Sequence, residues 1–359
     1  MILAHFRRLD WVLNGAILAM AFLSLATIDS VDPSLFWQQL VWFVIGFIVI
    51  FSFAQIDWRP LINYRWFVLL VYLIAVALLV ITYFFAPAIR GAKSWLVFGP
   101  VQFQTSELAK AALIIVFAYF FSHRHVGIGQ WQNIFISFIY FAVVAGLVLL
   151  QPDVGSTLVF FGLWASFLLM SGIRGRHLAV GLLLVSLLLG WGWNNFLQDY
   201  QQERVIALFH PAYDQLGVNY STIQSKIAIG SAGFLGKGFK QGTQVQLGFL
   251  LEAATDFVFA AFIEEWGLVG ALVFLFVFFL IIWRLIRLGL LAEGNFAKFV
   301  CFGTAVLFLI HFVLNLGSNL GLLPVVGIPL PFFSYGGSNL LTNAMLVGIV
   351  QSIVVRSSF

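Results

Sequence analysis

Hydrophobic residues of this chain gather in long runs, and polar segments separate one run from the next. A helix needs roughly 20 apolar residues to cross the hydrocarbon core of a bilayer, and ten runs approach or reach that length. They are Trp11–Ile28, Phe36–Ala54, Trp66–Phe85, Ser106–Phe121, Ile134–Leu150, Gly155–Ser171, Leu178–Trp193, Phe257–Trp283, Lys298–Leu316 and Phe333–Val355. The pattern predicts an all-α polytopic membrane protein of about ten transmembrane helices, in one integral membrane domain over residues 1–359.

Two of the separating segments are not ordinary connectors. Segment 194–256 is far longer than the others and is punctuated by glycines, so we expect a large outer loop that contains short helices. Segment 317–337, between the ninth and tenth runs, is rich in proline and glycine yet strongly apolar. Irregular backbone at membrane depth persists only when it is buried in protein or lines a wet cavity, so this segment is expected to re-enter the membrane domain. A long surface loop is the alternative.

Composition supports the membrane interpretation. The chain is 62% hydrophobic and 9% charged, and its mean hydropathy is +1.03. An ordinary globular chain is about 45–50% apolar and about 25% charged, so a soluble domain is excluded. The first run follows Arg7 and Arg8 but is long enough to span, and no small-residue cleavage pattern follows it. We therefore expect a retained helix rather than a signal peptide. Cys301 is the single cysteine, which excludes an intrachain disulfide.

Lysines and arginines predict the orientation, because cytoplasmic segments carry an excess of them. With a cytoplasmic amino terminus, 11 of the 18 fall inside, namely Arg7, Arg8, Arg59, Arg65, Arg124, Arg174, Arg176, Arg284, Arg287, Lys298 and Arg356. The outer side keeps Arg90, Lys93, Lys110, Arg204, Lys226, Lys237 and Lys240, and four of these lie in the long loop, which counts little toward topology. Both termini are expected to be cytoplasmic.

Acidic residues cluster where the large loop meets the eighth run: Glu252, Asp256, Glu264 and Glu265. Charges at the edge of hydrocarbon are costly, and chains that keep several use them for ions, protons, substrates or catalysis. If one straight helix begins near Asp256, Glu264 falls about 80° around the axis and roughly 12 Å deeper, with Glu265 on the opposite side. Asp256, in the first turn and close to water, is then the candidate general base. A structural interaction with the helix amino terminus is the alternative.

Basic residues predicted on the same outer side could form a second part of a site. Glu107 and Lys110 are three residues apart at the start of the fourth run and share a helix face, so a structural ion pair is one interpretation. The other interpretation is a group of basic residues that binds a phosphate-bearing ligand, since a pyrophosphate requires cations. The remaining members of this patch are Arg90, Lys93, Arg204, Lys226, Lys237 and Lys240.

Metal chemistry has little support in the sequence. No His/Cys cluster has the spacing of a structural metal site. His311 is alone in the ninth run, where we expect a hydrogen-bonded core residue. No cofactor is required by the sequence.

Several motifs that contain these residues follow one another along nearly the whole chain. They are Gly91-Ala-Lys-Ser-Trp, Gln104-Thr-Ser-Glu-Leu-Ala-Lys, Gln151-Pro-Asp-Val-Gly-Ser-Thr, Arg204-Val-Ile-Ala-Leu-Phe, Gln224-Ser-Lys-Ile-Ala-Ile-Gly-Ser-Ala-Gly, Glu252-Ala-Ala-Thr-Asp-Phe-Val-Phe and Gly321-Leu-Leu-Pro-Val-Val-Gly-Ile-Pro-Leu-Pro-Phe-Phe-Ser-Tyr-Gly-Gly-Ser. With these motifs the chain resembles the SEDS family of shape, elongation, division and sporulation proteins.

The resemblance implies a function. It implies a glycosyltransferase that polymerises lipid II into the glycan strands of peptidoglycan outside the bacterial plasma membrane during cell elongation, with a class B penicillin-binding protein as partner. By motif, Asp256 matches the family's essential aspartate. Glu107, Lys110 and Asp153 match polar positions that line its central cavity. The chain departs from the family pattern at Thr105, Leu251 and Ala254, and Ala254 removes any acid–base role for a histidine at that position.

The implied reaction assigns roles to the candidate residues. Asp256 would deprotonate the attacking sugar hydroxyl, while Lys and Arg side chains, with a divalent cation as an optional addition, would stabilise the leaving pyrophosphate. A lipid II translocase is the main alternative, because intramembrane charges and a broken helix also suit transport. A non-catalytic scaffold for a partner enzyme is a third interpretation.

Overall fold

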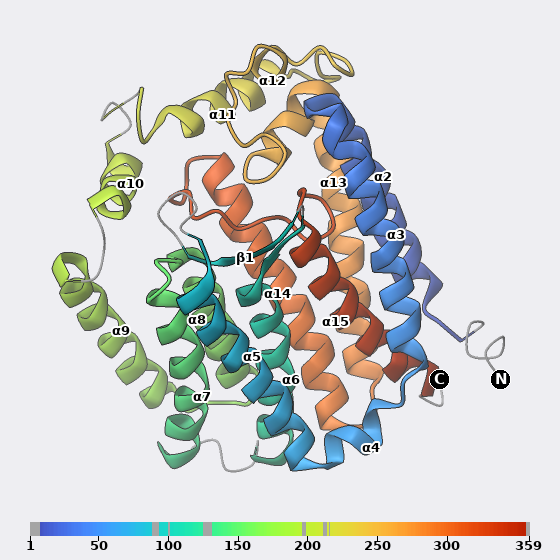
Figure 1. Ribbon diagram of the computed structural model, residues 1–359, viewed down its shortest axis with the longest axis vertical. Helices are drawn as coiled ribbons and strands as arrows, with labels where there is room; N and C mark the ends of the chain where they lie inside the picture. Colours follow the sequence, from blue (N-terminus) through green and yellow to red (C-terminus); the bar gives the residue numbers. More distant parts are fainter. Residues whose placement is uncertain are drawn as a thin grey trace.

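The protein is a bundle of long helices with shorter helices over one end (Figure 1). The computed structural model describes residues 8–87, 93–99, 101–124, 131–195, 199–210, 214 and 216–356. Eight helices in the described residues are long and apolar enough to cross a membrane: α2 (Trp11–Val31), α3 (Pro33–Gln55), α5 (Arg65–Phe85), α6 (Thr105–Arg124), α7 (Trp131–Leu149), α13 (Val258–Leu291), α14 (Asn295–Asn319) and α15 (Gly337–Arg356). The predicted all-α polytopic membrane fold is confirmed.

The sixth and seventh predicted spans also correspond to helices. They are α8 (Val154–Met170), which is apolar but shorter, and α9 (Gly175–Asn195), which lies at one edge of the bundle in Figure 1. Caps define several helix starts. The Asp10 side chain accepts from the Leu13 backbone N–H at the start of α2, and the Asp32 side chain accepts from the Ser34 N–H at the start of α3.

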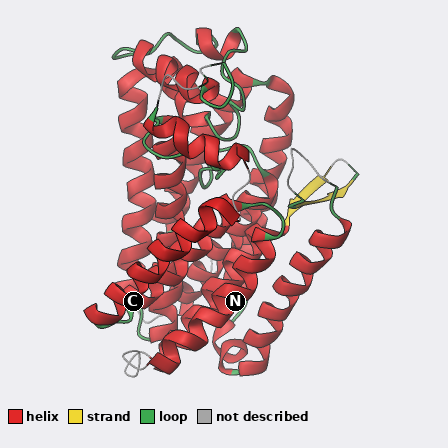
Figure 2. Ribbon diagram, turned by 90° about the vertical axis from the view of Figure 1, so that its left-hand side faces the viewer, coloured by secondary structure: helices red, strands yellow, loops and turns green. Residues whose placement is uncertain are grey.

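Short elements fill the connections. At one end of the bundle α4 (Trp58–Asn63) joins α3 to α5. Over the opposite end lie α10 (Asp199–Phe209), α11 (Tyr220–Ser231) and α12 (Thr243–Gln246), which are the short helices expected in segment 194–256. The sequence analysis missed a hairpin of β1 (Trp95–Phe98) and β2 (Val101–Gln104). Its antiparallel strands pair Trp95 with Gln104, and it projects beside the bundle in Figure 2.

Two helices, α15 and α6, are the most buried spans of the bundle. In α15 83% of the span is buried and in α6 78%, against 22% in α3 and 28% in α5, the two most exposed of the eight spans. Small residues let neighbours approach α6 closely, and Ala109, Ala112 and Ala118 are almost completely buried on it. The side view in Figure 2 shows the long helices running side by side.

The chain doubles back within α13, contrary to the prediction of one straight helix from Phe257. Gly267 has φ 65° and ψ −161°, and the Phe259 and Phe274 rings on either side of it are 5.2 Å apart. Residues 15 positions apart on a straight helix would be roughly 22 Å apart. Outer-loop backbone is bonded at this bend, where Lys237 N donates to Glu264 O and Leu268 N to Gly233 O. The part after Gly267 is about 36 Å long and spans the membrane alone.

This bend reverses the expected order of the acids. Glu264 and Glu265 lie next to the bend, where their carbonyls accept from Lys237 and Gly238 of the loop, whereas the Asp256 carbonyl accepts from Asn315 and Asn319 of α14. We call the end of the bundle that carries the bend the outer end and the opposite one the inner end, after the orientation predicted from the sequence. The prediction that Glu264 is about 12 Å deeper than Asp256 was wrong, because only glycine readily adopts the φ that turns the chain here.

Both described ends of the chain meet at the other end of the bundle. Arg284 Nε is 2.6 Å from Asp10 Oδ2, and the Asp10 N–H donates to Gln351 Oε1 at 2.9 Å. These contacts join α2, α13 and α15. We refer to Asp10, Arg284 and Gln351 as the inner clamp.

Candidate active site

Asp256 lies in a turn that precedes α13. Phe257 is the cap residue and Val258 the first helical residue, so Asp256 is outside the first helical turn in which it was predicted. Its backbone carbonyl accepts from Asn319 Nδ2 at 2.8 Å and from Asn315 Nδ2 at 3.1 Å. The residue is half-buried. The carboxylate is therefore attached to backbone that α14 holds in place.

Segment 320–336 lies directly against this turn. Ser334 Oγ donates to the Thr255 carbonyl at 2.7 Å, and the Tyr335 N–H donates to the Ala254 carbonyl at 2.9 Å. Gly327, with φ +69°, faces the Asp256 carboxylate: a Cβ on it would lie 3.7 Å from Asp256 Oδ2. A glycine at this position leaves space beside the carboxylate.

The same segment runs back along α14. Pro329 O accepts from His311 Nδ1 at 2.9 Å, although α14 ends eight residues later at Asn319. Eight helical residues correspond to about 12 Å, so the segment reaches about that far inward from the end of α14. Its irregular backbone is buried in protein at that depth, as such backbone must be within a membrane.

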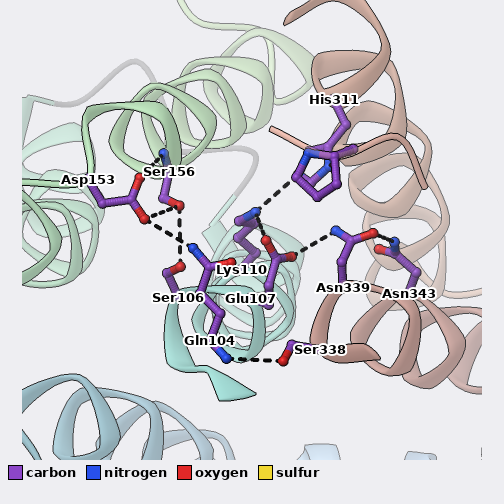
Figure 3. A network of polar contacts seen from close by, with 11 residues as sticks. Gln104, Ser106, Glu107, Lys110, Asp153, Ser156, His311, Ser338, Asn339 and Asn343 are labelled. Atoms are coloured by element: carbon purple, nitrogen blue, oxygen red, sulfur yellow. Dashed lines mark hydrogen bonds and ion pairs between the residues drawn. The ribbon is translucent and has the colours of Figure 1, made fainter. Parts of the chain in front are cut away.

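A buried polar network surrounds Lys110 (Figure 3). Lys110 Nζ donates to Glu107 Oε1 at 2.7 Å and lies 3.2 Å from His311 Nε2. Asn339 Nδ2 donates to the other oxygen of Glu107 at 3.0 Å, and Asn343 Nδ2 donates to Asn339 Oδ1 at 2.8 Å. Lys110 is completely buried and Glu107 is 2% exposed. The ion pair considered from the sequence exists, and α14 and α15 complete it.

Hydrogen bonding defines the protonation of His311. Pro329 O can only accept, so Nδ1 carries a proton. The Lys110 ammonium can only donate, so Nε2 accepts. His311 is thus a neutral imidazole with a defined tautomer, and the expectation of a hydrogen-bonded core histidine is confirmed.

Asp153 has a capping role in this structure. Its Oδ1 accepts from the Ser156 N–H at 2.9 Å and its Oδ2 from Ser156 Oγ at 2.8 Å, at the start of α8. Gln104 Nε2 also donates to Oδ2, at 3.3 Å, and Ser106 Oγ lies 3.3 Å from Ser156 Oγ. Figure 3 shows these residues on the opposite side of α6 from His311. Asp153 therefore joins α8 to α6 beside the Lys110 network.

The outer acids hold the loop to the bend. Completely buried Glu264 accepts from Lys237 Nζ at 2.7 Å and from the Gln244 N–H at 3.0 Å. Glu265 accepts from Ser30 Oγ at the end of α2. Lys237, predicted to bind substrate, is thus the ion-pair partner of Glu264. Lys240 likewise pairs with Asp29, at 2.8 Å.

Two other predicted cations line a small open pocket. Arg204 of α10 and Lys226 of α11 face it together with Asn219, Gly321 and Val325. Arg204 Nη1 donates to Val325 O at 2.7 Å, and the Lys226 side chain packs against Gly321 so closely that a Cβ there would overlap its ammonium. The segment that faces Asp256 at Gly327 thus contributes to this pocket as well.

The structure gives neither Arg90 nor Lys93 a role in these groups. Lys93 is exposed just before β1, and Arg90 lies outside the described residues. Asn315 and Asn319 were not singled out from the sequence. Their spacing could have identified them, since His311, Asn315 and Asn319 are four residues apart and polar residues at that spacing share one helix face.

Comparisons with known proteins give the chain a family. The model of the FtsW/RodA/SpoVE family, described as "Cell cycle protein", matches residues 7–358. The chain is 37% identical to peptidoglycan glycosyltransferase MrdB of Escherichia coli strain K12 over 340 residues, covering 94% of this chain and 90% of the relative. It is 34% identical to peptidoglycan glycosyltransferase MrdB of Helicobacter pylori, covering 98% and 90%.

Solved structures agree with the sequence comparisons. One, described as "Structural coordination of polymerization and crosslinking by a peptidoglycan synthase complex", matches with a TM-score of 0.82 and 32% identity, over 96% of this chain and 97% of that chain. The crystal structure of the Thermus thermophilus rod shape determining protein RodA matches with a TM-score of 0.73 and 29% identity, over 96% of both chains.

Proposed function

The chain belongs to the FtsW/RodA/SpoVE family of cell cycle proteins, and we propose that it is a peptidoglycan glycosyltransferase that polymerises lipid II at the outer face of the bacterial plasma membrane during cell elongation. The enzyme class is that named for the relatives. One observation supports the site assignment above all: a half-buried carboxylate, Asp256, on backbone held by α14 and opposite a glycine.

In the proposed reaction, the 4-hydroxyl of a sugar on one lipid II attacks the anomeric carbon of the other. Asp256 accepts the hydroxyl proton as the new C–O bond forms. The bond to the pyrophosphate breaks with inversion at the anomeric carbon, and the polyprenyl pyrophosphate leaves with the bonding electrons. General-base catalysis of this kind contributes typically about 10²–10⁴-fold.

Arg204 and Lys226 are the cations proposed to bind the pyrophosphate. Val325, whose carbonyl holds Arg204, is two residues from Gly327, which faces Asp256. Two residues span at most about 7 Å, so the backbone that holds Arg204 and the backbone that faces Asp256 lie within about that distance of each other. Guanidinium and ammonium groups stabilise the charge that develops on a leaving phosphate.

The pyrophosphate assignment has a direct test. Lys226→Gln should raise KM for the lipid-linked donor about tenfold, because a hydrogen bond to a charged group contributes about 1.5–3 kcal/mol. Lys298→Gln, at the opposite end of the bundle, is the matched control and should leave KM unchanged. Equal KM values in both variants would remove Lys226 from the proposed site.

A protein-held divalent cation fits these residues poorly. In the described part of the chain no three His, Cys, Asp or Glu side chains gather as a metal site, and Glu107 and Glu264 are each paired with a lysine. A divalent cation, if the reaction uses one, is therefore proposed to arrive with the pyrophosphate.

The partner protein and the orientation in the membrane are also proposals. The solved complex joins polymerization to crosslinking, so a class B penicillin-binding protein is the proposed partner. The amino-terminal helix start and the carboxyl-terminal helix end meet at the inner clamp, which supports both termini on one side of the membrane. The distribution of Lys and Arg in the sequence is the reason for proposing that this side is cytoplasmic.

The decisive experiment uses purified protein with its partner and lipid II. The wild-type protein should give long glycan strands on a gel, and Asp256→Asn should reduce the rate at least about 10²-fold. Glu252→Gln, an exposed acid four residues earlier, is the control and should polymerise normally. Wild-type polymerisation by Asp256→Asn would remove the catalytic assignment.

The same preparation tests the translocase alternative. Further along α6 from Lys110, aromatic rings pack together, with the Phe167 ring centroid 5.5 Å from Phe117, 5.9 Å from Phe121 and 5.8 Å from Phe299. A charged headgroup would have to cross this apolar layer, which favours chemistry at the outer end. If the protein moved lipid II between leaflets and made no polymer, the translocase would replace the polymerase.

A further inference from the structure

One face of the second half of α14 carries three buried polar side chains. His311, Asn315 and Asn319 are spaced four residues apart, so they lie above one another along the helix. Their exposed fractions are 0%, 2% and 0%. Burying amides and an imidazole in a membrane bundle is costly unless each group is hydrogen-bonded, so their partners indicate what they are for.

These side chains bind backbone carbonyls of two remote segments. His311 Nδ1 donates to Pro329 O at 2.9 Å, and Asn315 Nδ2 donates to Ile328 O at 2.9 Å. Asn315 and Asn319 both donate to Asp256 O. Asn315 is thus the residue that joins the two segments.

The carbonyls come from irregular backbone. Asp256 precedes the cap of α13, while Ile328 and Pro329 lie in the proline-rich segment. Buried backbone groups that secondary structure does not satisfy must be paired by side chains. The Asn319 Oδ1 atom also accepts from the Ala260 N–H at 3.2 Å and so orients the first turn of α13.

Lys110 acts on this arrangement through His311. Its ammonium occupies Nε2 as a donor, so the imidazole proton must be on Nδ1, the atom that faces Pro329 O. The Glu107–Lys110 pair thereby defines which nitrogen of His311 donates. The acceptor of that hydrogen bond, Pro329 O, is two residues from Gly327, the glycine that faces Asp256.

We propose that His311, Asn315 and Asn319 form a positioning ladder that holds the Asp256 turn and the 327–329 backbone at one fixed separation, with Lys110 selecting the His311 tautomer. These are positioning residues: they act on the reaction through the backbone on which Asp256 is carried. The proposal rests on Asp256 being the catalytic base. A displacement of about 1 Å in a reacting group can cost about 10²-fold in rate, so such a device has a measurable effect.

Two substitutions of His311 separate positioning from packing. The side-chain nitrogen of Asn mimics Nδ1 and can still donate to Pro329 O, whereas Gln reaches the position of Nε2 and loses this bond. Gln is closer to His in volume, so packing alone predicts that His311→Gln is the better enzyme. We expect the reverse: His311→Asn should retain a kcat at least about fivefold above that of His311→Gln, with similar KM. A kcat for His311→Gln equal to or above that of His311→Asn would overturn the proposal.

The asparagines give a second, independent measurement. Asn319→Ala should lower kcat about tenfold to a hundredfold with little change in KM, and the Asn315→Ala/Asn319→Ala pair should be non-additive because both donate to one carbonyl. Ser318→Ala is the matched control, since its hydroxyl donates to the Asn315 carbonyl within α14 and not to the Asp256 turn, and it should keep normal kcat. A loss in Asn319→Ala that disappears after correction for the folded fraction would contradict positioning.

Failure of this inference can be told apart from failure of the proposed function. If Asp256→Asn is inactive while His311→Gln equals or exceeds His311→Asn, the base assignment stands and the ladder is wrong. If Asp256→Asn is fully active, the function assigned to Asp256 is wrong, whatever the ladder variants do.

Discussion

The two ends of the bundle are built differently. At the inner end, the inner clamp joins regular helices through side chains of Asp10, Arg284 and Gln351. At the outer end, the chain bends at Gly267, segment 320–336 runs back along α14, and a completely buried lysine pairs with a glutamate.

The difference separates stability from chemistry. Regular helices satisfy their own backbone groups, so the inner end needs only a few polar contacts to hold them together. Irregular backbone at the outer end leaves carbonyls that buried side chains must satisfy, and that backbone carries the carboxylate. If this difference is real, substitution of a buried polar or glycine residue at the outer end should lower the stability of the protein more than substitution of a clamp residue at the inner end.

The largest effect is expected at Lys110. Lys110→Met leaves Glu107 as a buried charge without its cation, which costs about 3–5 kcal/mol. The melting temperature in detergent should therefore fall sharply. The double variant Glu107→Gln/Lys110→Met, which removes both charges, should recover a large part of that loss. A double variant no more stable than Lys110→Met would mean that unpaired charge is not the cause.

A smaller loss is expected at the bend. Gly267 has φ 65° and ψ −161°, and a Cβ on it would overlap the backbone nitrogen of Gly236. Gly267→Ala should cost about 1–3 kcal/mol from backbone strain, and more if the outer loop is displaced. The control is Gly15→Ala in α2, where no atom lies within 4 Å of the added Cβ and no loss of stability is expected. Equal melting temperatures for these two variants would show that the bend is not strained by a side chain.

The smallest effect is expected at the inner clamp. Arg284 is about one-fifth exposed, so Arg284→Gln should cost about 1–2 kcal/mol, measured as a modest fall in melting temperature. Glycosyltransferase kcat should be unchanged in the folded fraction, because the clamp lies at the opposite end of the bundle from the Asp256 turn, which is bonded to Asn319 at the end of α14. A large fall in kcat without loss of stability would show that the inner end also contributes to catalysis, contrary to the separation of stability from chemistry.

The sequence predicted the helices well because the membrane imposes a simple rule. Each run of about 20 apolar residues must form a helix, and the runs beginning at Trp11, Trp66 and Ser106 start within one residue of α2, α5 and α6. The acid cluster and the pairing of Glu107 with Lys110 were also visible, because both are local in sequence. The hairpin before α6 was missed, since its two strands are too short for a clear alternation.

The site required tertiary contacts. An apolar run does not reveal that Gly267 reverses the chain, so the depths of Asp256 and Glu264 were predicted in the wrong order. Lys237 looked like a substrate ligand until the folded loop placed it on Glu264.

Sequence alone determined that this is a multi-span membrane protein, which helices it forms and which residues carry charge, because hydrophobicity and charge belong to each residue. Only the tertiary structure decided that Asp256 is held by Asn315 and Asn319, and that Lys110 reaches His311. Those contacts join residues about 60 to 200 positions apart, and nothing in a local pattern specifies which buried donor will meet which unpaired carbonyl.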